Sequence, residues 1–272
     1  MPAITLTSDW GKSGCYLPQL KGSLLSLPTE GFSLETISDS IEPFDMEEAC
    51  FILRHSFPFF PKGSVHILAV SGKLQQRAAL AIVCRGDFFF IGEDDGRFSL
   101  LFENYDSAYH LVPKADECDF VEIRQICRAV RLIMESGGRL EAFIGSELEP
   151  ARLVEAAGSR AVVMPEQIIG HIVHVDCFGN AITDIGRDDF LKLQSHLINK
   201  GLSDGSYTIF AGGPHLKFNK IGRGYDSVEP GACTAFFNSC NLLELAMNGG
   251  SIARAEGLER RMEIMIRFNI YG

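Results

Sequence analysis

The chain has 272 residues and a mass of 30.0 kDa, which is enough for one large domain or two modest ones. Hydrophobic residues make up 46% and charged residues 22%, a composition that is typical of a folded globular protein and excludes a disordered chain. The net charge is −10, so the basic surface that nucleic-acid binding requires is missing. We therefore expect no nucleic-acid partner.

The cysteines and the apolar segments indicate the compartment. Eight cysteines are scattered along the chain without a Cys-x-x-Cys pair, which predicts free thiols in a reducing compartment and no disulfide framework. The first residues carry no basic segment, and no apolar run approaches the roughly 18 residues that a membrane span needs. We therefore expect a cytoplasmic protein with no membrane partner.

Strands alternate with helices in the first part of the chain. Short apolar runs predict strands at 3–7, 32–37, 65–70, 80–84 and 88–91. Asp45 and Glu48 form a capping-box pattern, and the apolar spacing over 46–57 predicts a helix that prolines terminate. The spacing over 120–134 predicts another helix, which a Gly-Gly pair ends. This alternation is typical of an α/β layered domain with a largely parallel sheet.

The pattern changes near residue 164. From there, short apolar strands separated by Gly-rich turns are predicted at 168–176, 181–185, 207–211, 216–221, 233–237, 242–247 and 263–268. Their spacing indicates a small β-barrel or sandwich. We therefore predict an N-terminal α/β domain at 1–164 and a small C-terminal β-barrel domain at 165–272.

One candidate binding residue ends the first predicted strand. Asp9 follows this strand shortly before Gly11. Ligands of open α/β sheets bind outside the carboxyl ends of the strands, so a carboxylate here is suited to hold a ribose diol. The alternative is an aspartate that caps a turn.

Further candidates lie in two turns of the second domain. The segment 176–180 joins two predicted strands, with Phe178 offering a stacking face and Asn180 an amide that matches the edge of adenine. The same segment also fits an ordinary hairpin. Asn238 and Ser239 end another predicted strand, where capping of the strand end is the default interpretation.

Two acidic or histidine-containing segments raise the question of a metal. His171, His174 and Asp176 lie close in sequence, but in a strand His171 points away from the other two, so we predict no metal site. The acidic run 93–95 fits a hard-cation site or a turn, and the turn is favoured because the run follows a strand.

Several short motifs occur together in one order across the whole chain. They are residues 5–11 (TLTSDWG), 21–22 (KG), 41–45 (IEPFD), 60–66 (FPKGSVH), 95–96 (DG), 175–183 (VDCFGNAIT), 238–239 (NS), 243–246 (LELA) and 249–251 (GGS). In this combination the chain resembles the S-adenosylmethionine (SAM) hydroxide adenosyltransferases, which are relatives of the fluorinases and chlorinases.

The resemblance implies a homotrimer that binds SAM or adenosine and needs no further cofactor. Each site would lie between the N-terminal domain of one subunit and the C-terminal domain of its neighbour. In the N-terminal domain, Asp9 would hold the ribose hydroxyls and Phe44 would pack on the sugar. The chemistry of the family is displacement at the ribose C5′ by water or halide, with release of methionine.

The resemblance also assigns residues of the C-terminal domain to substrate binding. Phe178 and Asn180 would take the adenine. Asp176 and Ser239 would contact the methionine end, and Asn238 belongs to the same substrate-binding set.

Three polar positions of the hydroxide-type members are only partly matched. Ser71 stands where those members have an aspartate, in a loop that is one residue shorter, whereas Arg77 matches the family arginine. The family histidine is absent, and Val121 or Glu122 occupies its place. The predicted catalytic residues are therefore Arg77 and Ser71, with Glu122 assisting.

The sequence leaves three functions open. The first is hydrolysis of SAM to adenosine and methionine by an altered catalytic set. The second is a trimer that binds adenosine or SAM without turnover, as a sensor or scaffold. The third is a different nucleophile or a modified nucleoside substrate, which the altered loop at 71–76 suggests. Glu93 and Asp95 suggest it too, because they stand where the family's fourth loop has proline and asparagine.

Overall fold

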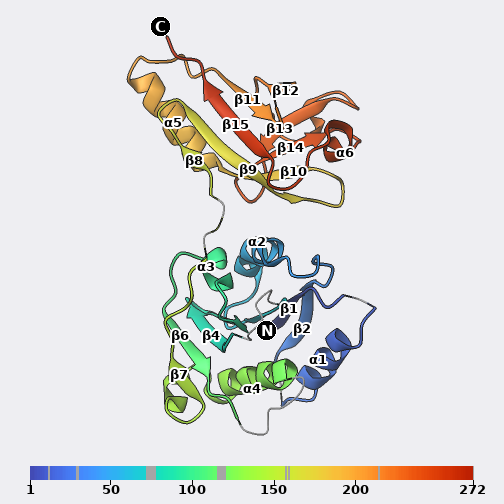
Figure 1. Cartoon of the computed structure of the whole chain (residues 1–272), viewed down its shortest axis with the longest axis vertical. Helices are drawn as coiled ribbons and strands as arrows, with labels where there is room; N and C mark the ends of the chain where they lie inside the picture. Colours follow the sequence, from blue (N-terminus) through green and yellow to red (C-terminus); the bar gives the residue numbers. More distant parts are fainter. Residues whose placement is uncertain are drawn as a thin grey trace. The chain divides into compact units, whose positions relative to one another are not determined.

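The structure is a computed structural model that describes residues 1–271 apart from 12, 29–30, 72–77, 115–120, 157, 159 and 214. The chain divides into two compact units, Met1–Gly158 and Ser159–Gly272 (Figure 1). The boundary predicted from the sequence, after residue 164, lies slightly further along the chain. In the part of the chain that the structure describes, none of the helices combines the length and the hydropathy of a membrane span.

The first unit is built on a mixed sheet. Its strands are β1 (Ala3–Ser8), β2 (Ser33–Ser38), β3 (Val65–Ala69), β4 (Leu80–Arg85), β5 (Phe88–Glu93), β6 (Ser107–Leu111) and β7 (Leu148–Pro150). Among the described residues they form one seven-stranded sheet in the order β2-β1-β3-β5-β4-β6-β7. The four strands from β2 to β5 in this order are parallel, which confirms the predicted α/β class.

The remaining strands are added by antiparallel pairing, which the sequence analysis did not specify. β4 and β5 are joined by a turn at Gly86, whose φ of 57° lies in the left-handed region that glycine adopts readily. So short a connection permits only an antiparallel pair, since parallel strands need a crossover of a dozen or more residues.

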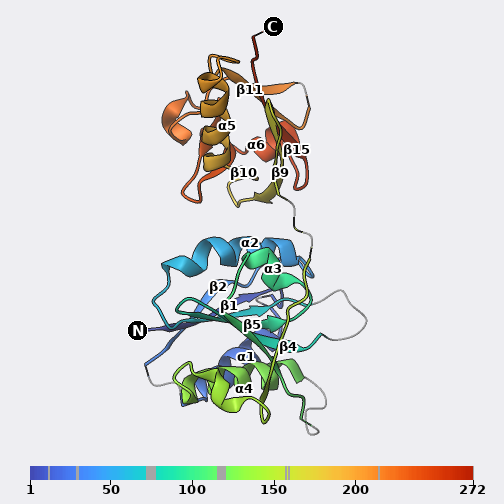
Figure 2. The same cartoon turned by 90° about the vertical axis from the view of Figure 1, so that its left-hand side faces the viewer.

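Helices cover both faces of this sheet. Figure 2 shows α1 (Tyr16–Leu25) and α4 (Val121–Glu135) on one face, and α2 (Met46–Ser56) and α3 (Arg97–Leu101) on the other. Each face has its own buried apolar cluster. Two short 3-10 helices, η1 (Phe57–Phe59) and η2 (Leu140–Phe143), complete the described elements of this unit.

The predicted start of α2 is confirmed, with one difference in its capping. The Asp45 side chain accepts a hydrogen bond from the Glu48 amide at 3.0 Å. The Glu48 carboxylate, however, accepts from the Glu42 amide at 3.4 Å instead of returning to Asp45. The reason is that the Asp45 amide already donates to the Glu42 carbonyl at 3.0 Å.

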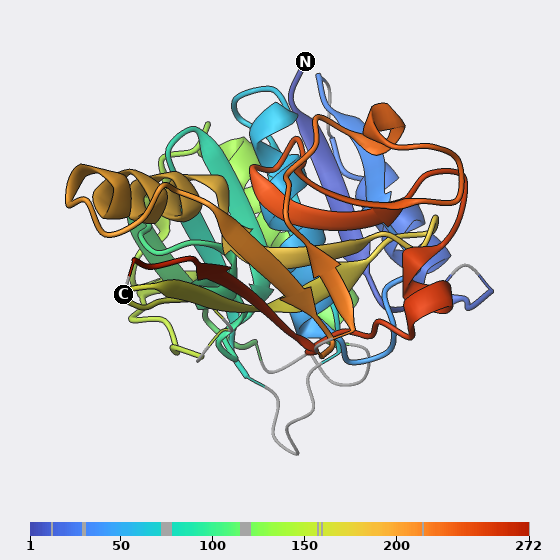
Figure 3. The same cartoon turned by 90° about the horizontal axis from the view of Figure 1, so that it is seen from above.

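The second unit is a nearly closed antiparallel sheet, as predicted. Its strands are β8 (Val162–Val163), β9 (Gln167–Val175), β10 (Ala181–Gly186), β11 (Tyr207–Ala211), β12 (Leu216–Phe218), β13 (Cys233–Phe237), β14 (Leu242–Met247) and β15 (Glu263–Phe268). In the described residues their order is β12-β11-β15-β9-β10-β14-β13, with β8 paired to β9. Figure 3 shows these strands curving around the interior of the unit.

Helix α5 (Arg187–Asn199) is an element of this unit that the sequence analysis missed. Its apolar residues Phe190, Leu193 and Leu197 follow helical spacing and join the buried core of the sheet. The shorter α6 (Ile252–Glu256) and the 3-10 helix η3 (Tyr225–Ser227) are also present. In Figures 1 and 3, α5 and α6 lie on opposite sides of the second unit.

Candidate functional site

Three of the predicted residues meet at the carboxyl ends of β1 and β3. Asp9 follows β1, and Ser71 follows β3, the neighbouring strand. Oδ2 of Asp9 accepts a hydrogen bond from the backbone N–H of Phe44 at 2.9 Å. Both carboxylate oxygens of Asp9 lie 3.2 Å from the backbone nitrogen of Ser71. Asp9 therefore ties together the loop that precedes α2 and the loop that follows β3.

Phe44 has an uncommon conformation at this edge. Its φ is 66°, in the left-handed region that bulky residues rarely adopt. The residue is 48% exposed, so full burial of the ring does not offset the cost of this backbone conformation. An exposed aromatic side chain in a strained backbone conformation favours a binding role over a packing role.

The two interpretations of Asp9 are compatible in this geometry. The carboxylate caps two backbone amides, as the turn interpretation requires. An ionised carboxylate offers roughly four acceptor positions, so these amides leave capacity for a ligand hydroxyl. The ribose role remains a prediction.

The predicted catalytic residues are described only in part. Ser71 is half-buried and is the second residue after β3, and Glu122 lies in the first turn of α4. Arg77 lies outside the described residues, together with the rest of the segment 72–77.

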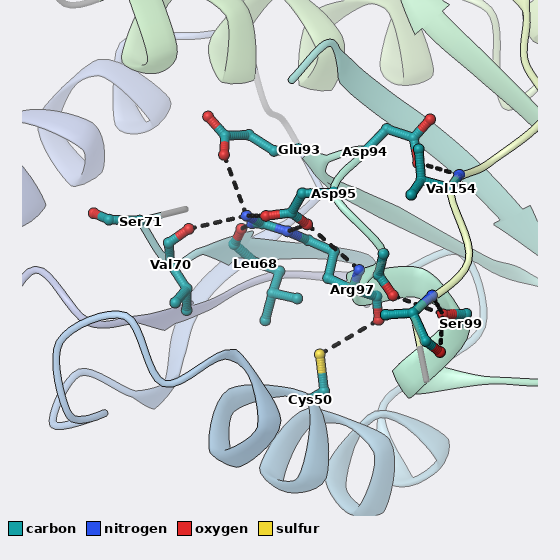
Figure 4. Close-up of polar contacts among 12 residues, drawn as sticks. Cys50, Leu68, Val70, Ser71, Glu93, Asp94, Asp95, Arg97, Ser99 and Val154 are labelled. Atoms are coloured by element: carbon teal, nitrogen blue, oxygen red, sulfur yellow. Dashed lines mark hydrogen bonds and ion pairs between the residues drawn. The ribbon is translucent and has the colours of Figure 1, made fainter. Parts of the chain in front are cut away.

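A buried arginine that the sequence analysis missed lies next to this edge (Figure 4). The side chain of Arg97, the first residue of α3, is fully buried. Its Nε and Nη2 donate to the two carboxylate oxygens of Asp95, each at 2.8 Å, and Nη2 lies 3.4 Å from Oε2 of Glu93. Its Nη1 donates to the Leu68 carbonyl at 2.8 Å, and its Nη2 donates to the Val70 carbonyl at 3.1 Å.

The charge of this arginine is balanced within the cluster. Burial by itself lowers the pKa of Arg97, but the hydrogen bond and the negative charge of Asp95 outweigh it, so the pKa lies above its ordinary value. The guanidinium is therefore a permanent buried cation. The sequence signal that could have found it is the arginine that closely follows the acidic run 93–95.

The acidic run 93–95 lies where β5 ends at Glu93 and the chain bends, in agreement with the turn that the sequence analysis favoured. Asp94 accepts hydrogen bonds from the Val154 amide and from Nε2 of His110, both at 2.8 Å. Glu93 and Asp95 contact the guanidinium described above. Among the residues that the structure describes, no group of three or more His, Cys, Asp or Glu side chains is arranged to hold a metal ion.

In the second unit, Asp176 organises the turn between β9 and β10. Its Oδ1 accepts from the amides of Phe178 at 2.9 Å and Asn180 at 2.8 Å, and its Oδ2 accepts from the Asn180 side chain at 2.9 Å. Gly179 has a φ of 82°, and a Cβ there would collide with Ser251. This tight turn leaves Phe178 74% exposed, whereas Asn180 is buried.

The two predicted adenine-binding residues of this turn differ in exposure. The exposed Phe178 leaves its aromatic face available, and its contact with a ligand remains a prediction. The Asn180 amide nitrogen carries two hydrogens, of which the bond to Asp176 uses one.

Asn238 organises the turn between β13 and β14. Its Oδ1 accepts from the amides of Cys240 at 2.9 Å and Leu242 at 3.2 Å, which is the capping role that the sequence favoured. Its Nδ2 donates to Glu244 at 2.9 Å. Ser239, in the same turn, is exposed.

Glu244 is a buried carboxylate between the two turns. It accepts hydrogen bonds from Asn238 and, at 2.7 Å, from the hydroxyl of Tyr225. Burial raises the pKa of Tyr225, and the hydrogen bond and charge of Glu244 and the charge of Asp176 raise it further. Ile182 of β10 pairs with Glu244 of β14, and Gly186 pairs with Leu242. Because this pairing is antiparallel, the turn that precedes β10 and the turn that precedes β14 flank opposite ends of the two strands.

Comparison with known proteins identifies the family. The model of the SAM hydroxide adenosyltransferase N-terminal domain matches residues 4–143, and that of the C-terminal domain matches residues 170–265. The chain belongs to the SAM hydroxide adenosyltransferase family. This agrees with the resemblance that the short motifs indicated.

The named relatives of this family member have low sequence identity to it, and two of the three match along nearly its whole length. The (R)-S-adenosyl-L-methionine hydrolase of Thermus thermophilus is 25% identical over 274 residues, covering 98% of this chain and 100% of that protein. The hydrolase of the same name from Methanocaldococcus jannaschii is 24% identical over 190 residues, 68% of each chain. A fluorinase of Actinopolyspora mzabensis is 23% identical over 299 residues and covers 97% of each chain.

Solved structures share the fold of this family member. An uncharacterized conserved protein from Thermotoga maritima matches with a TM-score of 0.79 at 22% identity, covering 98% of this chain and 100% of that one. A conserved hypothetical protein from Thermus thermophilus matches with a TM-score of 0.71 at 24% identity, covering 97% and 99%. At these identities the likeness establishes the fold of both units.

Proposed function

We propose that this chain hydrolyses SAM to adenosine and methionine, with water displacing methionine at the ribose C5′ and with no bound cofactor. The observation that carries the proposal is the arrangement around Asp9, whose carboxylate is anchored by the Phe44 and Ser71 amides at the carboxyl end of β1. Ligands of open α/β sheets bind at this edge. The family supplies the substrate class, since two relatives are named (R)-S-adenosyl-L-methionine hydrolase.

The first unit binds the sugar and the water in this proposal. Asp9 accepts hydrogen bonds from the ribose hydroxyls through the acceptor positions that the two backbone amides leave. Phe44, with its exposed ring, packs on the sugar. Ser71 and Arg77 orient the attacking water, with Glu122 assisting.

The second unit binds the two ends of the substrate. Phe178 stacks on the adenine, and Asn180 bonds its edge with the hydrogen and oxygen that remain. Asp176 and Ser239 contact the methionine amino and carboxylate groups, while Asn238 holds the turn that presents Ser239. In the proposed homotrimer, the second unit of a neighbouring subunit completes each site.

The proposed reaction needs few catalytic groups. The sulfonium of SAM is already a good leaving group and departs as neutral methionine, so no general acid is required. Water adds its oxygen to C5′, the C5′–sulfur bond breaks, and one proton is released to solvent. The protein must orient the water in line with the sulfur and exclude other water.

Incubation with SAM followed by chromatography tests the proposal. We expect adenosine and methionine in equal amounts, and their loss in Asp9→Ala. Asp204→Ala is the matched control, because the Asp204 carboxylate likewise accepts a backbone amide, that of Ser206 at 2.8 Å, in an exposed turn of the second unit. Adenosine no higher than in the enzyme-free blank rules out hydrolysis.

A second function, binding of adenosine or SAM without turnover, is favoured by one observation. By the resemblance described above, Ser71 stands at the position of an aspartate and Glu122 near the position of a histidine, so the polar set of the hydroxide-type members is incomplete. Loss of a general base typically slows a reaction by about 10² to 10⁴. Calorimetry separates the two functions: binding of SAM without release of adenosine supports a sensor or scaffold, and no binding rules out both.

A further inference from the structure

A single peptide group joins the buried Arg97 to the proposed ribose-binding carboxylate. The carbonyl of Val70 accepts a hydrogen bond from Nη2 of Arg97 at 3.1 Å. The N–H of the same peptide, which belongs to Ser71, donates to both oxygens of Asp9 at 3.2 Å. The Val70–Ser71 peptide is therefore held on one side by a cation and on the other by an anion.

The position of Arg97 follows from the end of a strand pairing. The register between β3 and β5 ends with Ile67 opposite Ile91. Beyond this point Arg97 supplies donors to the carbonyls of Leu68 and Val70. Beyond the last residue pair of β3 and β5, the guanidinium therefore takes the place of a neighbouring strand as the hydrogen-bond donor to the carbonyls of Leu68 and Val70.

The residues around Arg97 provide space for its side chain and negative charge for its guanidinium. Gly92 leaves the space that the side chain occupies, because a Cβ there would lie 3.0 Å from Cδ of Arg97 and 3.3 Å from the Leu68 carbonyl oxygen. Asp95 binds the guanidinium through two parallel hydrogen bonds, and Glu93 adds a second negative charge. Both carboxylates of this loop therefore face the same cation.

We propose that Arg97 is a positioning residue that fixes the Val70–Ser71 peptide and, through its N–H, orients the Asp9 carboxylate. A charge on the carbonyl side polarises the peptide and strengthens the N–H as a donor on the other side. A bidentate arginine pair also fixes direction, since the planar guanidinium permits one orientation. The link is a property of the fold, and its consequence for nucleoside binding rests on the proposed function.

The test needs variants that keep the fold. Removing a buried arginine alone leaves Asp95 without its partner, which is strongly destabilising, whereas removing both charges is often neutral. The main variant is therefore the double substitution Arg97→Met with Asp95→Asn, and Arg97→Lys keeps the charge without the planar fork. The matched control is Arg128→Met, since Arg128 is also buried and bonds a carbonyl and a carboxylate, those of Val112 and Glu147. Glu147 keeps a second cationic partner, Lys114 at 2.7 Å, so this substitution does not leave its carboxylate unpaired.

The first measurement is amide hydrogen exchange at Ser71, followed by NMR in the absence of any ligand. We expect exchange at Ser71 to accelerate by at least about tenfold in the double variant, and less in Arg97→Lys, with no change in Arg128→Met. Unchanged protection of the Ser71 amide in a folded double variant overturns the proposal. This readout does not depend on whether the protein binds adenosine.

The second measurement is the affinity for adenosine in a double-mutant cycle with Asp9. The double variant is expected to raise the Kd about three- to tenfold, and to raise it no further when Asp9→Ala is already present. Equal effects with and without Asp9 mean that Arg97 does not act through Asp9. If the wild type binds no adenosine, the proposed function fails, while the exchange rates still decide the role of Arg97.

Discussion

Replacing Asp9 with alanine removes the acceptor of two backbone amides at once. The backbone nitrogens of Phe44 and Ser71 lie 2.9 and 3.2 Å from Oδ2 of the carboxylate. Hydrogen bonds to a charged group contribute roughly 1.5–3 kcal/mol each, but water replaces part of the loss at this half-exposed site. We therefore expect the free energy of unfolding of the first unit to fall by about 1–2 kcal/mol in total, which lowers its melting temperature by about 2–8 °C.

The same substitution should also lower the affinity for adenosine, independently of its effect on stability. If Asp9 accepts hydrogen bonds from both ribose hydroxyls, Asp9→Ala weakens adenosine binding by at least about tenfold, since 1.4 kcal/mol is a factor of ten. Asp9→Asn keeps one oxygen for the amides and should restore most of the melting temperature. It should not restore the affinity, because its NH₂ group cannot accept from a hydroxyl.

Thermal unfolding and titration calorimetry on the same preparations separate these effects. The account requires that Asp9→Ala lower both the melting temperature and the affinity. A variant that melts earlier and binds adenosine as tightly as the wild type shows that Asp9 only caps two loops. The ribose assignment, and with it the proposed site, is then wrong.

Three further predictions address the chemistry, the pH dependence and the assembly. Ser71→Asp should leave the Kd for adenosine nearly unchanged and raise hydrolysis modestly, because the family histidine is still missing; a loss of affinity measured by calorimetry would contradict this. Burial lowers the pKa of His66 from 6.5 to about 4, so the neutral ring stabilises the fold above pH 6.5 and this contribution is lost as the pH falls through 4. Denaturant unfolding between pH 7 and pH 4 should therefore show a loss of about 3 kcal/mol in the wild type that is absent in His66→Asn, and equal pH dependence of the two proteins would refute the assignment. Light scattering should give a trimer of three 30.0-kDa chains, about 90 kDa, and a monomer at all concentrations would contradict a site shared between subunits.

The environment of His66 explains the direction of that shift. The ring lies in β3 among the side chains of Phe57, Phe60, Phe88 and Phe90, with centroid distances of 5.8, 5.6, 5.6 and 5.2 Å. Its Nδ1 lies 2.7 Å from the Thr5 hydroxyl, while the buried Nε2 has no hydrogen-bond partner among the residues that the structure describes. A protonated ring would therefore bury an unpaired charge among aromatic side chains.

Much of the fold could be predicted because strands and helices leave local patterns of apolar and capping residues in the sequence. Short apolar runs located each predicted strand of the second unit, and Asp45 located the start of α2. Helix α5 was missed because its three core residues are separated mostly by polar ones, and the neighbouring strands set the expectation of an all-β domain. The apolar spacing of Phe190, Leu193 and Leu197 was the signal that would have found it.

The candidate site could be predicted less completely, because its contacts join distant parts of the chain. The position of Asp9 after a strand could be predicted from the sequence. Its hydrogen bonds to the amides of Phe44 and Ser71 could not, because they depend on which strands become neighbours in the sheet. Arg97 was missed because arginine is almost never fully buried without partners, and its carbonyl partners lie about thirty residues earlier in the chain. A charged residue reveals such a role only when the fold places its partners around it.

The measurement that tests the central claim most directly is SAM turnover in water enriched in heavy oxygen. Mass spectrometry of the product reports where the oxygen of adenosine comes from. Displacement at C5′ by water predicts methionine and adenosine in equal amounts, with one heavy oxygen on the adenosine 5′ carbon. Adenosine without heavy oxygen, or no adenosine above the enzyme-free blank, would contradict the proposed hydrolysis.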